Sequence, residues 1–171
     1  YLSDYFKART AKDLGIKDLV DNSERVRKFL FADPTLNNLG EGKNGLELQT
    51  AIINQVDLMT SWESAWTSIR EGNWPYDQPD LFGQHRLQML VRVLGHTLPI
   101  PLLLQASRKL SPKDFLSTVH VLEKVFFRYK IICAKPAGKL DDLYNKFISI
   151  LDSTDQMQVD IFKGESQALL D

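Results

Sequence analysis

The chain has 171 residues, of which 43% are hydrophobic and 25% charged, a composition typical of one globular domain rather than a disordered segment. The single cysteine, Cys133, excludes a disulfide within the chain and a zinc site built from several thiolates, and it suits a reducing, cytoplasmic location. The formal net charge is only -1, and no apolar run approaches the ~18 residues of a membrane span, so we expect no membrane partner.

Apolar periodicity predicts helices from the start of the chain. Residues 16–31 form the first amphipathic pattern, which Asp33-Pro34 should end because proline disfavours helical geometry in the residue before it. Residues 33–45 are rich in Asn and Gly and predict a mobile loop. Next comes the clearest helix, with Gly72 suited to its C-terminal cap. Its apolar residues recur at spacings of three and four: Ile52, Val56, Met59, Trp62, Trp66 and Ile69.

A Pro-rich and aromatic loop follows at about 73–83. Its three aromatic residues either close the end of the bundle or contact a base or a protein partner: Trp74, Tyr76 and Phe82. The spacing of Leu87, Leu90, Val91 and Leu94 predicts a third helix, which ends near Gly95. Prolines 99 and 101 should interrupt the chain before a short helix over 102–109.

The most informative segment runs from Ser111 to Cys133. Ser111-Pro112 followed by Asp114 predicts a helix start, with Ser as the cap, Pro in the first turn and a carboxylate at the third position. From Val121 onward the helix is apolar on nearly every side, which is typical of a rod at the centre of a bundle. We therefore expect Cys133 to be a packing residue.

Two further helices are predicted, one over about 140–151 and one from Met157 to Leu170. No segment alternates between apolar and polar residues as a strand would. The fold class expected for residues 1–171 is therefore a single all-α domain, a bundle of about six to seven helices with a long central helix near 111–133.

Few residues suggest chemistry. His85, His96 and His120 lack partners at the spacing of a helical zinc motif, so we interpret them as surface or capping residues. The Gly-rich stretch 40–42 lacks the Lys and Ser/Thr that complete a phosphate loop. The sequence therefore predicts no catalytic residue, no metal ligand and no cofactor-binding residue. An enzyme with carboxylates that cannot be paired by spacing is the weakest alternative.

Positive charge concentrates in the middle of the chain, where residues 84–146 contain 11 Lys/Arg against 4 Asp/Glu. Five polar residues recur along one edge of the 111–133 helix: Lys113, Ser117, His120, Lys124 and Arg128. This edge either contacts phosphates or is the solvent-facing side of a core helix. The candidate nucleic-acid or interdomain surface comprises Arg108, Lys109, Lys113, His120, Lys124 and Arg128.

Several short motifs resemble a known family. The sequence YLSDYFKAR at residues 1–9, followed by IKDLV at 16–20, is similar to the segment after the N-terminal domain of GmrSD-type, modification-dependent restriction proteins. Residues 126–131, FFRYKI, together with the preceding Leu122-Glu123, resemble a core helix of that family, and Pro136, Leu140 and Tyr144 continue the pattern.

This resemblance implies that the chain is the helical middle region of a longer protein, which agrees with its start at Tyr1 rather than at a methionine. The parent would be a nucleotide-dependent endonuclease with a ParB/sulfiredoxin-like N-terminal domain and an HNH-like C-terminal domain. The family's nucleotide-handling and nuclease motifs do not occur here, so only a structural or interdomain role carries over, to Arg128.

The expected function is thus a non-catalytic scaffold whose partners are the flanking domains of the same polypeptide and, weakly and electrostatically, DNA. The alternative is a helical protein–protein interaction domain of unrelated function, which would use the aromatic loop and exposed apolar helix faces.

Overall fold

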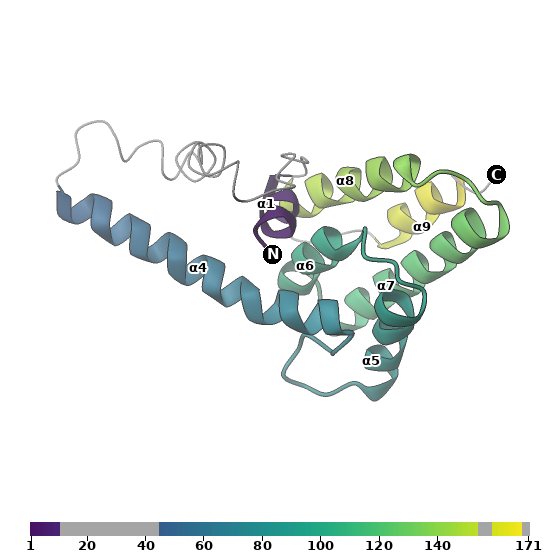
Figure 1. The fold of residues 1–171 in the computed structure, drawn as a ribbon, viewed down its shortest axis with the longest axis horizontal. Helices are drawn as coiled ribbons and strands as arrows, with labels where there is room; N and C mark the ends of the chain where they lie inside the picture. Colours follow the sequence, from purple (N-terminus) through teal and green to yellow (C-terminus); the bar gives the residue numbers. More distant parts are fainter. Residues whose placement is uncertain (11–44, 154–158, 169–171) are drawn as a thin grey trace.

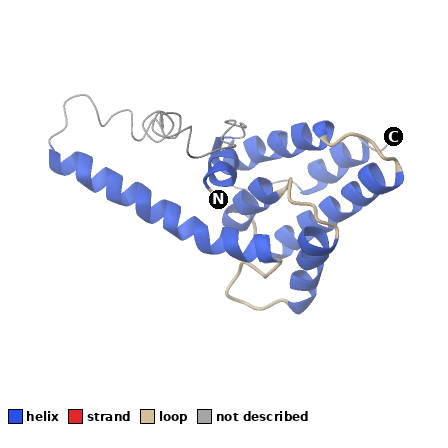
Figure 2. Ribbon diagram, viewed as in Figure 1, coloured by secondary structure: helices blue, strands red, loops and turns tan. Residues whose placement is uncertain are grey.

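The computed structural model describes residues 1–10, 45–153 and 159–168, and within these ranges every regular element is a helix (Figures 1 and 2). This confirms the predicted all-α bundle. The helix predicted at 16–31 and the loop predicted at 33–45 lie outside the described residues, apart from Gly45. The α-helices are α1 (Leu2–Thr10), α4 (Gly45–Glu71), α5 (Leu81–Gln88), α6 (Ile100–Lys109), α7 (Pro112–Phe126), α8 (Gly138–Ser153) and α9 (Val159–Ala168). Two π-helical segments, η1 (Met89–Val93) and η2 (Phe127–Ile132), extend α5 and α7.

Helix α7 and its extension η2 form the predicted central rod. The Ser111 hydroxyl oxygen accepts a hydrogen bond from the Asp114 backbone N–H at 3.2 Å, and Pro112 occupies the first turn, as the sequence predicts. Phe115 and Leu122 are fully buried, and Val125 is nearly so. Helices α5, α6 and α9 all pack against α7. The rod therefore supplies the side chains around which these three helices assemble.

The end of the rod is more exposed than the sequence predicts. Tyr129 is buried, but Phe127, Ile131 and Ile132 are 47%, 53% and 65% exposed, and Cys133 is exposed rather than packed. The π-helical turn explains part of this error. It accommodates an extra residue per turn, so the 3.6-residue periodicity used to assign a buried face no longer applies beyond Phe126.

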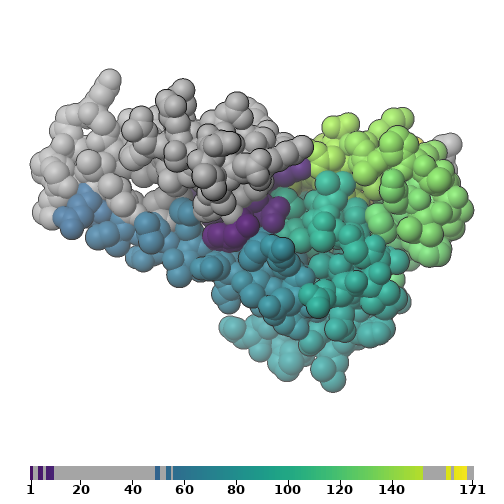
Figure 3. Space-filling view, in the orientation of Figure 1, coloured from purple at the N-terminus to yellow at the C-terminus, as the bar shows by residue number. Residues whose placement is uncertain are grey.

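Helix α4 is buried over its C-terminal half, whereas the described side chains of its N-terminal half are exposed. Trp62 and Ile69 are core residues, whereas Ile53 and Val56 are half exposed, and Figures 1 and 3 show the N-terminal half extending away from the other described helices. The helix ends at Gly72, whose φ of +79° suits glycine. The predicted helix and its cap are thus confirmed, but the described residues of the predicted apolar stripe are buried only in part.

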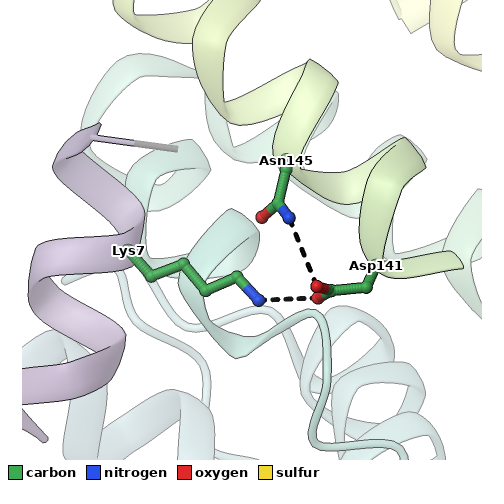
Figure 4. A network of polar contacts seen from close by, with 3 residues as sticks. All are labelled: Lys7, Asp141 and Asn145. Atoms are coloured by element: carbon green, nitrogen blue, oxygen red, sulfur yellow. Dashed lines mark hydrogen bonds and ion pairs between the residues drawn. The ribbon is translucent and has the colours of Figure 1, made fainter. Parts of the chain in front are cut away.

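Side chains of helix α1 contact both α4 and α8. Tyr5 is fully buried, with its ring edge-on to Trp62 at 5.2 Å, and the Trp66 indole N–H donates to the Asp4 carboxylate at 2.9 Å. On the other side, the Lys7 ammonium donates to the Asp141 carboxylate at 2.6 Å, and that carboxylate also accepts from the Asn145 amide at 3.3 Å (Figure 4). These polar contacts fix the orientation of a short helix that would be marginal alone.

The aromatic loop closes one end of the bundle. Trp74 and Tyr76 each pack edge-on to Phe115, and the Tyr76 hydroxyl donates to the Leu110 carbonyl at 3.1 Å. Phe82 behaves differently because the loop ends at Asp80, earlier than predicted. The Asp80 side chain caps α5, so Phe82 lies in the first turn of that helix and is 54% exposed.

His96 is buried, which corrects its interpretation as a surface or capping residue. Its ring stacks on Phe126 with 3.9 Å between centroids, and its Nε2 shares a 2.9 Å hydrogen bond with the Tyr144 hydroxyl. Burial lowers the pKa of His96 to about 4, so this imidazole is neutral at physiological pH. The stacked pair therefore buries a neutral aromatic ring rather than a charged one.

A consequence of this burial is a pH-dependent stability. Between about pH 6.5 and pH 4 the unfolded chain protonates His96 and the folded chain does not, so the free energy of unfolding should fall as pH decreases through this window, by on the order of 3 kcal/mol. Urea unfolding at several pH values measures it. The His96→Gln variant should lose this component of the pH dependence, whereas the same change at the exposed His85 should retain it. Parallel wild-type and His96→Gln curves would contradict the assignment.

Packing also restricts Gly83 in α5. A Cβ at this position would lie 2.6 Å from the buried Trp74 ring, so Gly83→Ala should destabilise the fold by about 1–3 kcal/mol despite alanine's better helix propensity. Gly164 in α9 is the matched control because a Cβ there meets nothing within 4 Å, and Gly164→Ala should stabilise by about 0.5–1 kcal/mol. Thermal unfolding of both variants tests this, and equal effects would show that Trp74 does not restrict Gly83.

Candidate anion-binding face on helix α7

Three of the sequence-predicted surface residues meet on one edge of the central rod. His120 and Lys124 lie on α7, and Arg128 lies one turn further, in η2. All three line two cavities, one on either side of this edge. The first, of about 430 Å³, lies between α7 and α9 and is called the α7–α9 cavity. The second, of about 410 Å³, is bounded by α5, η1 and α7 and is called the α5–α7 cavity.

The other three predicted residues lie elsewhere. Lys113 is exposed at the start of α7, about two turns before His120, and lines neither cavity. Arg108 and Lys109 are on α6, where the Arg108 guanidinium lies 5.8 Å from the centre of the Trp62 ring. The six residues therefore do not form one surface around these cavities.

The α5–α7 cavity contains a cation that the sequence analysis missed. Arg86 of α5 donates from one guanidinium nitrogen to both carboxylate oxygens of Glu123, at 3.0 and 3.3 Å, and its guanidinium lies 5.4 Å from the Phe82 ring centre. Its buried Nε has no hydrogen-bond partner in the described part of the chain. Apolar side chains complete the lining: Met89, Leu94 and Phe127. The cavity thus combines charged and apolar walls.

His120 stands between the two cavities. Its ring lies edge-on to Phe82 at 5.7 Å, and its buried Nε2 has no hydrogen-bond partner within the described ranges. The pKa of His120 is lowered, mainly by desolvation and then by the charges of Arg86 and Lys124, which Glu123 partly offsets. A neutral imidazole beside Arg86 and Lys124 adds no further charge repulsion to this edge.

The α7–α9 cavity is bounded on its far side by α9. Ser166 of this helix is only 2% exposed, and its hydroxyl has no hydrogen-bond partner in the described structure. The described lining of this cavity includes Lys124 and Arg128 and contains no carboxylate. Sequence analysis missed Ser166, because nothing in a short terminal helix pattern indicates which residue faces another helix.

The structure describes residues 1–10, 45–153 and 159–168. These ranges contain no group of three or more His, Cys, Asp or Glu side chains arranged to hold a metal ion. Within the same ranges, no helix has the length and apolarity required to cross a membrane.

The charges around His120 can be tested one at a time. Lys124→Ala should raise the His120 pKa because it removes a nearby cation, whereas Glu123→Gln should lower it because it removes the opposing anion. Titration of the His120 ring proton by NMR measures both shifts. Lys130→Ala, which removes an exposed lysine that lines neither cavity, is the control. Shifts of equal sign in the two test variants would refute this account of His120.

Comparison with known proteins found no match to the chain among protein-family models, curated proteins or solved structures.

Proposed function

We propose that this chain is a helical scaffold domain that presents the α7 edge to the phosphate backbone of DNA, in the manner implied by its resemblance to the middle region of GmrSD-type restriction proteins. The observation that carries the DNA-facing part is the convergence of Arg86, Lys124 and Arg128 on two adjoining cavities, with one carboxylate, Glu123, among them. Lys124 and Arg128 are exposed and can reach a ligand.

The distribution of charge favours attraction of DNA to one part of the surface rather than to the whole chain. The whole chain has a net charge of -1, so it does not attract DNA as a uniformly basic protein would. The excess of cations lies in residues 84–146, which include all three of these residues. Binding should therefore be weak, independent of base sequence and strongly dependent on salt, because it releases counterions from the phosphates.

The scaffold role is supported by the way the first and last described helices are held. Helix α1 is fixed by the Lys7–Asp141 ion pair and by burial of Tyr5. Helix α9 is fixed by the fully buried Phe162, whose ring packs against Phe147 with 4.4 Å between centroids. Segments continuing from either helix would therefore start from a fixed position and direction.

The DNA-facing part predicts a specific salt dependence. A fluorescent duplex of ~20 base pairs, titrated with the full 171-residue chain at several salt concentrations, should bind most tightly at low salt. Lys124→Ala/Arg128→Ala should weaken binding about tenfold at ~50 mM salt and reduce the slope of log affinity against log salt by about 2, because two phosphate contacts are lost.

The matched control is Lys130→Ala/Lys139→Ala, which removes two exposed charges outside both cavities. A similar loss in both double variants would indicate diffuse attraction and would exclude the α7 edge as the contact. Absence of binding in the unmodified chain would reject the DNA-facing role and leave the protein–protein interaction domain as the better hypothesis.

A further inference from the structure

The α7–α9 cavity has a feature that a surface for duplex DNA does not require, namely the buried hydroxyl of Ser166. This side chain is 98% buried, yet its oxygen has no partner among the described residues. Buried hydroxyl groups in native proteins are nearly always hydrogen-bonded, because leaving water without a new partner is unfavourable. A ligand that reaches the Ser166 side of the cavity would supply the missing partner.

The rest of the lining defines the charge of that ligand. Lys124 and Arg128 are both exposed, and the described lining includes no Asp or Glu. Neither cation has an ion-pair partner within 4 Å among the described residues. Two cations and a buried hydroxyl are donors that suit an anion with several oxygens.

We propose that the α7–α9 cavity binds the phosphate group of a phosphomonoester. Ser166 Oγ–H, which is buried in the ligand-free chain, would turn toward the cavity to donate to one terminal oxygen, and the Lys124 ammonium and the Arg128 guanidinium would pair with the others. A monoester fits better than a backbone diester because its phosphate is a chain end, which can enter a cavity between two helices. A diester continues in both directions and stays at the surface.

The cavity of about 430 Å³ has the size of a small-molecule site, so the phosphate could belong to a free nucleotide or to the 5′ end of a DNA strand. The DNA end as a source rests on the proposed function, whereas the free nucleotide does not. The shared chemistry is the terminal phosphate, and the measurements below separate the two sources.

Inorganic phosphate is the first probe. Thermal unfolding of the full chain should show a higher Tm in millimolar phosphate than in chloride of equal ionic strength. Ser166→Ala should abolish this difference. Without phosphate, Ser166→Ala should be more stable than Ser149→Ala, because only the former removes a buried, unpartnered hydroxyl while both place alanine in a helix. Ser149 is the control since it is exposed and its hydroxyl donates to the Asn145 carbonyl. No phosphate effect in the unmodified chain, or an equal effect in Ser166→Ala, would overturn the proposal.

The second probe is a pair of single-stranded oligonucleotides of one sequence, with a 5′-phosphate or a 5′-hydroxyl. If the source is a DNA end, the chain should prefer the phosphorylated strand by about fivefold or more, and Ser166→Ala should remove the preference without weakening binding of the hydroxyl strand. Equal affinities together with a retained effect of inorganic phosphate would support the small-molecule source. Failure of the proposed function appears separately, as duplex binding that ignores Lys124→Ala/Arg128→Ala.

Discussion

The structure depends on the burial of α6 and of one side of α7. Helix α6 packs against α1, α4, α7 and α8, and its residues from Ile100 to Ala106 are all buried. Phe115, Leu122 and Val125 are buried on α7, and α5, α6 and α9 all pack against it. Removal of this apolar surface from water is the main favourable contribution to such an assembly. Burial of the apolar side of α7 also constrains the opposite edge of this helix, because its polar residues must face outward wherever the apolar ones face inward. The polar edge of the site and part of the core are thus two sides of one helix.

The spacing of apolar residues predicted the helices well where these residues recur on one face. The C-terminal half of α4 and the start of α7 at Ser111 are as expected, since capping and spacing are local properties. Burial was predicted less well at Val56, Phe127 and Ile131, because exposure depends on where neighbouring helices end. His96 was misjudged for the same reason: its partners, Phe126 and Tyr144, lie 30 and 48 residues away.

The candidate site, like the fold, was predicted from the sequence only in part. His120, Lys124 and Arg128 share a helix edge, so their spacing was sufficient to group them. Arg86 and Ser166 come from α5 and α9, and only the packing of those helices on α7 brings them to the cavities. Arg108 and Lys109 were grouped with the site on charge alone, although α6 places them outside both cavities. A single sequence gives the composition of a helix face but not the identity of the residues opposite it.

The wide turn of η2 has a geometric effect on this edge. On a regular α-helix, side chains four residues apart drift around the axis by about 40° at each step, so a row at 120, 124 and 128 would curl away from a straight line. A turn that contains an extra residue rotates less per residue and opposes this drift just where Arg128 begins. Local underwinding therefore straightens the row formed by His120, Lys124 and Arg128, so that a linear array of negative groups could lie along it without twisting.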